Sequence, residues 1–304
     1  MTTTAAVPRA EVRRRGNRTA AGEAHRLLPR PLLVTVTVIL CAMVVIPTSY
    51  IVLASLNTDI GVAEGQFWPS TFSVDSYTKI WTTANLATGL FNSILVCAFV
   101  AVFSALLGTI TAYVLVRFTF TGRLTILRGL VGLQSIPGTL MLLPVFVLFS
   151  SAGNYLGVAV VGSRWGLFIA YLTFALPFST WVMVTYLRGL PRELEEAGRM
   201  DGAGTVTILF RIIVPLSLPA IVVSAIFAFL LGWNDVLFAS VLTRPETQTA
   251  AVALSIFATT QEGGALPVYS QVMAAALVTA APVVLLYLVF QRYLVGGLTA
   301  GGVK

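Results

Sequence analysis

The charged residues that could take part in chemistry are concentrated in one segment, residues 191–219. Its first half reads PRELEEAGRMDGAG and carries three glutamates, two arginines and one aspartate. The segment stands between long apolar runs in a chain whose residues are only 10% charged. Charged groups are costly inside lipid, so a segment of this kind is expected outside the bilayer, where it can bind a soluble protein.

Motifs for catalysis or metal binding are missing from the sequence. The two lysines, Lys79 and Lys304, do not follow the glycine spacing of a phosphate-binding loop, so ATP binding of that kind is not expected. The single histidine, His25, lies in a basic tail, and Cys41 and Cys97 lie in apolar runs. These residues do not assemble a nucleophile with a base or a set of metal ligands. We therefore expect no catalytic, cofactor or metal site in this chain.

The elements that position the charged segment are membrane helices. Hydrophobic residues make up 57% of the chain, and a helix of about 20 apolar residues spans a bilayer. Runs this continuously apolar also argue against the alternating strands of a β-barrel. We predict an all-α integral membrane protein with six transmembrane helices, near residues 32–56, 90–116, 127–149, 166–187, 216–240 and 269–291.

The distribution of arginine and lysine predicts the orientation. Sixteen of the 19 basic residues fall in the tails and in the loops around residues 117–128 and 188–211, and only Lys79, Arg164 and Arg244 fall on the other side. Because basic residues are enriched on the cytoplasmic side, both termini and the charged loop are predicted to be cytoplasmic. The first apolar run is too long for a signal peptide and no cleavage pattern follows it, so we expect a membrane anchor.

These predictions divide the chain into regions along its length. They are a basic cytoplasmic tail (1–30), a first transmembrane helix (31–56), an extracytoplasmic loop (57–89), a core of five helices (90–291) that contains the cytoplasmic loop at 188–215, and a cytoplasmic tail (292–304). The basic tail predicts contact with membrane lipid or a disordered segment, and nucleic-acid binding is not expected.

The charged loop has the local pattern of two short helices joined by a bend. Pro191 suits the first turn of a helix, and the glutamates that follow complement the helix dipole. Glu195 and Arg199 are four residues apart and are expected to pair on one side. Apolar residues recur at helical spacing on the other side: Leu190, Leu194, Ala197 and Met200. Glycines then permit a bend, and a second amphipathic helix is predicted to start near Thr205.

The spacing within this loop resembles the EAA loop of permease subunits of ATP-binding-cassette importers. Their pattern is EAA, three residues, Gly, nine residues and Ile-x-Leu-Pro, and this chain has Glu196-Ala197-Gly198, Gly202, Ile212 and Pro215. Gly198 replaces the second alanine and Val214 the leucine. The run FLLGWNDVLFA at 229–239, the ending QRYLVGGLTAGGVK and the Asn92-Ser93 pair are similar to carbohydrate-uptake permeases, including maltose permeases.

The resemblance implies the partners and the role of the loop. A type I importer has two permease subunits, two ATPase subunits that hold ATP and Mg²⁺, and an extracytoplasmic sugar-binding protein. The loop would form a coupling helix that docks in a cleft of an ATPase subunit. The residues implied in ATPase coupling are Glu196, Ala197, Gly198, Asp201, Gly202 and Ala203. The sugar itself is left open among disaccharides, oligosaccharides, glycosides and polyol phosphates.

Polar residues within the predicted spans are candidates for the substrate path, because such residues rarely face lipid. They are Asn92, Gln134, Asn234, Asp235 and Gln271. Asp235 is the only acid within a predicted span and lies twenty residues after Pro215, about 30 Å along a helix and so near the outer surface. A structural role in capping or in pairing with the second permease is an equal alternative for it.

Two other classes of protein share some of these features. A stand-alone secondary carrier or channel would work without ATPase subunits and would carry more charges within its spans. A non-transporting membrane scaffold or sensor would tolerate any loop sequence and would need no polar path. Co-purification with an ATPase would separate the importer subunit from both.

Overall fold

The computed structural model describes residues 29–262 and 268–300, and every regular element within those ranges is helical. The helices are α2 (Arg30–Ser55), α3 (Asp59–Ala63), α4 (Asp75–Thr83), α5 (Leu86–Arg117), α6 (Arg123–Gln134), α7 (Gly138–Leu156), α8 (Arg164–Arg188), α9 (Glu193–Met200), α10 (Thr205–Ile208), the π-helical turn η1 (Leu209–Ile213), α11 (Val214–Leu216), α12 (Leu218–Trp233), α13 (Leu237–Leu242), α14 (Ala250–Glu262) and α15 (Tyr269–Ala300). The predicted all-α class is confirmed. The basic tail at 1–28, on which a predicted lipid contact depends, lies outside the described residues.

The chain divides into two compact units, residues 1–50 and residues 51–304. The described part of the first unit is most of α2, whose aliphatic side chains, such as Val38, Met43 and Val44, are more than half exposed. The hydroxyl of Thr35 donates a hydrogen bond to the carbonyl of Pro31, at 2.9 Å. An apolar exterior with hydrogen bonds closed inside the helix is what a lipid environment requires.

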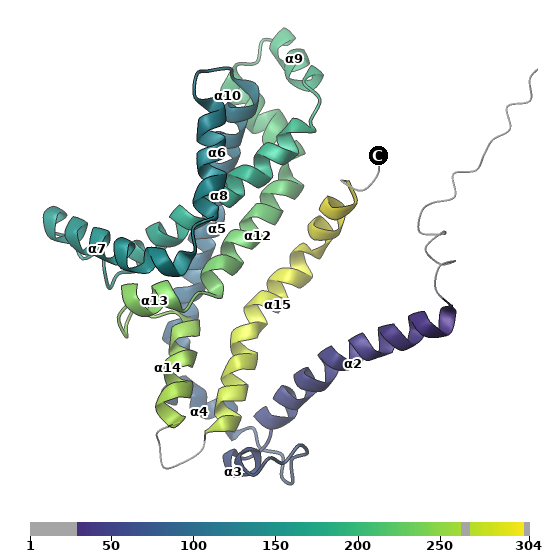
Figure 1. Cartoon of the computed structure of the whole chain (residues 1–304), viewed down its shortest axis with the longest axis vertical. Helices are drawn as coiled ribbons and strands as arrows, with labels where there is room; N and C mark the ends of the chain where they lie inside the picture. The colour runs from purple at the N-terminus through teal and green to yellow at the C-terminus, as the bar shows by residue number, and fades with distance from the viewer. Residues whose placement is uncertain (1–28, 263–267, 301–304) are drawn as a thin grey trace, which may run out of the picture. The chain divides into compact units, whose positions relative to one another are not determined.

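The core of the second unit is built by α5, α8 and α12, which pack side by side (Figure 1). α5 has 32 residues and contains no proline. Where α5 meets α8, a Cβ added to Gly108 would lie 2.9 Å from Cβ of Ser179 and 3.1 Å from the backbone nitrogen of Thr180. Small residues at this crossing let the two backbones approach closely, as in other membrane helix pairs.

The third predicted span is divided in the structure. Residues 127–149 were expected to form one helix, but α6 ends at Gln134 and α7 begins at Gly138. Pro137 explains the break, because a proline disfavours helical geometry at the preceding residue, Ile136, and donates no backbone hydrogen bond. The span of sufficient length and apolarity is therefore α7, Gly138–Leu156.

The fifth predicted span is also corrected. It was expected over 216–240, but α12 ends at Trp233 and a short break separates it from α13. The helical segment Thr205–Leu216 precedes α12 and meets it at a bend of 77°. Within the described residues, five helices (α2, α5, α7, α8 and α15) are long and apolar enough to cross a membrane, and the bent pair raises the number to six.

Short helices occupy the segments that the sequence suggested were loops. The predicted loop at 57–89 contains α3 and α4, and α14 was not predicted. Ser270 in the first turn of α15 donates to the carbonyl of Asn57, at 2.7 Å, and its hydroxyl lies 2.8 Å from that of Ser76. These bonds attach the segment before α5 to the last helix. α15 continues to Ala300, so most of the predicted tail at 292–304 is helical.

Candidate functional site

The charged loop folds as the predicted helix, bend and second helix. α9 contains the three glutamates, and α10 starts at Thr205 as predicted. Pro191 does not lie in the first turn of α9, because the helix starts two residues later with Arg192 as its N-cap. Figure 1 places α9 beyond α10, at the end of the α5, α8 and α12 group opposite to α14.

Gly202 forms the bend by ending α9 in a left-handed conformation, with φ of 81°. Its N–H donates to the carbonyl of Arg199 at 3.0 Å, and the N–H of Ala203 donates to the carbonyl of Gly198 at 2.9 Å. This pair of bonds is the Schellman arrangement, in which glycine is preferred because other residues strain at positive φ. The glycine at position 202 is therefore a requirement of the helix terminus.

Gly198 has a second role, which is to let α9 lie against the following helix. A Cβ at this position would lie 2.8 Å from Cδ1 of Ile212 and 3.5 Å from Cγ1 of Ile208. Gly198 is buried, and Ile208 and Ile213 belong to a core cluster with residues of α5 and α8. Alanine, which the EAA pattern has here, would need only the flexible end of Ile212 to move.

Glu195 is the buried charge of the site, with 2% of its surface exposed. Its Oε1 accepts from Nε of Arg117, at 2.5 Å, and its Oε2 accepts from the hydroxyl of Tyr113, at 3.3 Å. Nη2 of Arg199 lies 3.7 Å from Oε2, so the predicted pair on α9 is confirmed. Nη2 of Arg117 also donates to the carbonyl of Leu190, at 3.2 Å. Sequence reasoning did not single out Arg117, although a basic residue at the end of a span was a signal for it.

The opposite side of α9 is exposed and mixes apolar and acidic residues. Met200 is 88% exposed, and Leu194 is also exposed. Glu196, Ala197, Asp201 and Gly202 are exposed as well, so four of the six predicted coupling residues are accessible. An apolar surface of this kind on a charged helix is typical of a protein-binding site.

The two buried amides among the predicted path residues are bonded within the chain. Asn92 is fully buried, and its Nδ2 donates to the carbonyls of Glu246, at 3.1 Å, and Gln248, at 2.9 Å. Its Oδ1 accepts from Nε of Arg164, at 2.6 Å. Gln271 donates from Nε2 to Oδ2 of Asp59, at 3.0 Å, and accepts from the hydroxyl of Thr83, at 3.2 Å. Both amides therefore hold elements together.

The other three candidates lie at helix ends. Asp235 follows α12, accepts from the N–H of Ala239 at 3.0 Å, and accepts from the hydroxyl of Tyr171 at 2.8 Å. It thus caps α13 from the break and does not lie inside a span helix. Gln134 ends α6 and Asn234 caps the C-terminus of α12, and both side chains are exposed. The structure does not bring the five predicted path residues together in one cluster.

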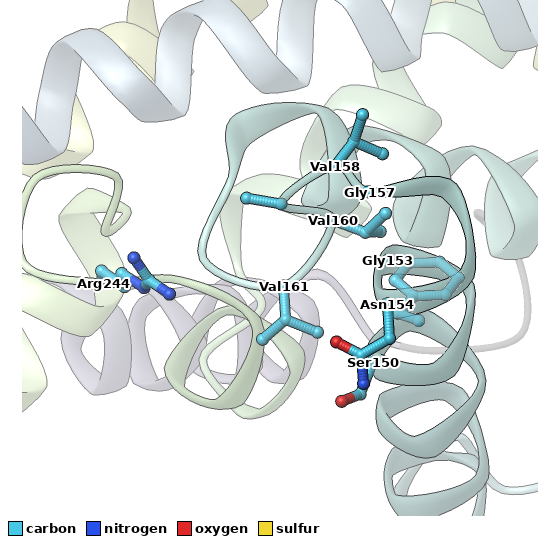
Figure 2. A pocket seen from close by; sticks show the side chains of 10 residues that line it. Ser150, Gly153, Asn154, Gly157, Val158, Val160, Val161 and Arg244 are labelled. Carbon is cyan, nitrogen blue, oxygen red and sulfur yellow. The ribbon is translucent and has the colours of Figure 1, made fainter.

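A cavity of about 500 Å³ lies between the end of α7, the following residues 157–161 and Arg244. Figure 2 shows Ser150 and Asn154 on one side of Val161 and the Arg244 guanidinium on the other. Polar groups that do not converge give no defined ligand site. Among the described residues, no group of three or more metal-ligating side chains occurs.

Comparison with known proteins decides the family. The model of the family described as "Binding-protein-dependent transport system inner membrane component" matches residues 104–299, more than half of the chain. The chain belongs to this family. It is therefore a non-catalytic, multi-pass permease component of the cytoplasmic membrane in a binding-protein-dependent transporter, as the EAA-like loop predicted.

Individual relatives and a solved structure agree with this family assignment. The chain is 32% identical to the trehalose transport system permease protein of Mycobacterium tuberculosis, over 85% of this chain and 92% of that one. It is 31% identical to the maltose/maltodextrin transport system permease protein of Salmonella typhimurium, over 82% and 79%. A crystal structure of a bacterial ABC transporter involved in the import of alginate contains a chain with the same fold, with a TM-score of 0.72 and 21% identity, over 90% and 98%.

Proposed function

We propose that this permease component imports a disaccharide, an oligosaccharide or a related glycoside, together with a second permease, two ATPase subunits and an extracytoplasmic sugar-binding protein. The support for a sugar is that relatives covering most of the chain are named for trehalose and for maltose. ATP and Mg²⁺ are bound by the ATPase subunits. This chain supplies membrane helices, a docking surface for an ATPase and part of the path.

The observation that carries the proposed coupling role is the exposed side of α9. Glu195 and Gly198 face the rest of the chain, so Glu196, Ala197 and Met200 are left to face a partner. Asp201, Gly202 and Ala203 complete the surface and set the direction in which the chain leaves it. A short helix with a mixed apolar and acidic face suits a cleft in an ATPase subunit.

Substitution at Met200 tests this docking surface. Met200→Asp puts a charge at the centre of the proposed contact, and we expect the ATPase subunits to dissociate from the purified complex. The matched control is Thr125→Asp, which adds the same charge at an exposed position of α6. The measurement is the amount of ATPase that co-purifies with the tagged permease. Equal ATPase in both variants would refute the docking surface.

The proposed orientation has both termini and α9 in the cytoplasm. The support is the excess of basic residues in the tails and in the loop that contains α9. Cysteines introduced at Ser70 and Ala203 should be labelled from opposite sides of the membrane, Ser70 from outside, in a chain without Cys41 and Cys97. Labelling of both positions from the same side by an impermeant reagent would contradict the orientation.

In the proposed substrate path, the exposed amide side chains contact the sugar and the buried ones do not. Asn234 and Gln134 have exposed side chains, whereas Asn92 and Gln271 are bonded within the chain. Asp235 fixes the break after α12 through its bonds to Tyr171 and α13. We assign sugar contact to Asn234 and Gln134, and positioning of the path wall to the other three residues.

A further inference from the structure

The Arg117 end of α5 carries a buried charge pair to which the proposed function gives no role. We propose that Glu195 and Arg117 are positioning residues that fix the coupling helix α9 to α5, so that movement of α9 reaches the far end of α5. This inference rests on the proposed docking of α9 to an ATPase subunit.

The hydrogen bonds of Arg117 fix the direction in which α9 leaves the end of α5. Nε and Nη2 of Arg117 donate to two different acceptors, Glu195 on α9 and the carbonyl of Leu190 before α9. Both side chains of the pair are buried, and the Tyr113 hydroxyl one turn earlier on α5 donates to the same carboxylate. Arginine presents its donors in a fixed planar fork, so two bonds specify the direction of the attached segment as well as its distance.

Nothing else described on α9 fixes its direction in this way. Gly198 of α9 packs against Ile212 and Ile208, but this contact is apolar and has no hydrogen bonds to set a direction. Its remaining side faces outward, and Arg199, the third member of the charge cluster, belongs to α9 itself. A buried ion pair adds little net stability compared with apolar residues of similar size, and its best-attested use is to specify one arrangement.

α5 is suited to carry a displacement from one end to the other. It contains no proline and packs against α8 without a gap at Gly108. At its other end Asn92 is bonded to the carbonyls of Glu246 and Gln248, and the Ser93 hydroxyl accepts from the N–H of Ala250, at 2.8 Å. Asn92 and Arg117 are about 38 Å apart along the helix. The same rigid element therefore joins α9 to the segment before α14.

The test uses the assembled transporter and MgATP with orthovanadate as the probe. A single cysteine replaces Glu246, whose side chain is exposed, in a chain without Cys41 and Cys97. In the transporter that keeps Glu195 and Arg117, vanadate trapping should change the maleimide labelling rate of the cysteine at position 246. The apolar pair Glu195→Leu with Arg117→Met should still assemble and hydrolyse MgATP, but its trapping-dependent change should be about tenfold smaller. The control is Glu193→Gln with Arg128→Gln, which removes two exposed charges from α9 and α6.

The outcomes separate the inference from alternatives. A full labelling change in the assembled apolar pair would overturn it. If the apolar pair does not assemble, Arg117→Lys keeps the charge but loses the planar fork that sets the direction, and it is judged in the same way; failure of that variant to assemble would also overturn the inference, because the pair would then serve the fold alone. If the wild-type complex binds no ATPase, the proposed docking of α9 fails instead. If it binds ATPase but shows no trapping-dependent change, movement of α9 does not reach the far end of α5 and the inference is overturned.

Discussion

The two ends of α5 are both held by buried polar groups, but the attachments differ in kind. At the Arg117 end, the carboxylate of Glu195 on α9 accepts hydrogen bonds from the Arg117 guanidinium and the Tyr113 hydroxyl. At the Asn92 end, a neutral amide donates to two backbone carbonyls and accepts from Arg164. Both attachments include a backbone carbonyl of a connecting segment, but the first is built on a pair of charged side chains and the second on a neutral amide.

The difference indicates which end can change its arrangement. Asn92 is fully buried, so breaking its bonds would leave its amide unpaired in the interior, which is costly. The carboxylate partner of Arg117 lies on α9, which is exposed apart from Glu195 and Gly198, so α9 can shift as a body while the charge pair holds. We expect the Asn92 end to act as a fixed junction and the Arg117 end to receive movement.

The largest effect is expected from Asn92→Leu, which breaks the fixed junction. The change leaves two carbonyls and the Arg164 guanidinium without their partner, at about 3 kcal/mol in total, and should lower the Tm of the purified complex by roughly 5–10 °C. Asn154→Leu, at an exposed amide of α7, is the control and should leave Tm unchanged. An unchanged Tm in Asn92→Leu would show that the two ends do not differ as described.

A smaller effect is expected when α9 is pushed away from its support. Gly198→Leu cannot fit against Ile212, whereas Gly198→Ala needs only a shift of the Ile212 side-chain end. We expect Gly198→Leu to reduce ATP-driven transport about tenfold, equal to about 1.4 kcal/mol, and Gly198→Ala to have little effect. Uptake into proteoliposomes checks both variants, and equal uptake would argue that the position of α9 on α10 and η1 is unimportant.

The bend after α9 should be sensitive to backbone strain rather than to space. No atom lies within 4 Å of a Cβ added at Gly202, but φ there is 81°. Gly202→Ala should cost about 1–2 kcal/mol, and Gly202→Asn less, because asparagine tolerates the left-handed conformation. Thermal unfolding measures these changes. If asparagine and aspartate reduce uptake far more than alanine does, a partner surface contacts Gly202 in the complex.

The smallest effect on assembly is expected at Asn234, the exposed counterpart of the buried Asn92. Asn234→Ala removes no hydrogen bond of the side chain within the described residues, so the free energy of unfolding should stay within about 0.5 kcal/mol of the wild type. If its amide contacts the sugar, the concentration for half-maximal uptake should rise several-fold. An unchanged uptake curve would remove Asn234 from the path.

The parts that sequence predicted well are those governed by local chemistry. The short helix, its glycine terminus and the start of the next helix follow from caps and glycines within about 15 residues. Apolar length alone placed α2, α5 and α8 to within a few residues. The break at Pro137 was also a local signal, but the apolar run around it was long enough to conceal it.

The rest depends on contacts between distant residues. Asn92 bonds to carbonyls more than 150 residues away, and Arg117 pairs with Glu195 across 78 residues. When those distant partners are unknown, a polar residue in a predicted span is interpreted as lining the substrate path. Asn92 and Gln271 instead hold separate elements together through hydrogen bonds. The sequence predicted that α9 has one apolar face. It did not predict that this face is the exposed one, because the buried side is set by the position of Arg117 on α5.

The bend of 77° before α12 has a mechanical consequence. The helical segment Thr205–Leu216 stands across the axis of α12 as an arm of about 18 Å. A force along the membrane plane at the Thr205 end therefore acts as a torque about Ser217. A sideways shift of about 2 Å at that end, a size common for helix movements, corresponds to a turn of about 6° at the base of α12. Small displacements of a surface helix are thus converted into rotation of a helix that crosses the lipid.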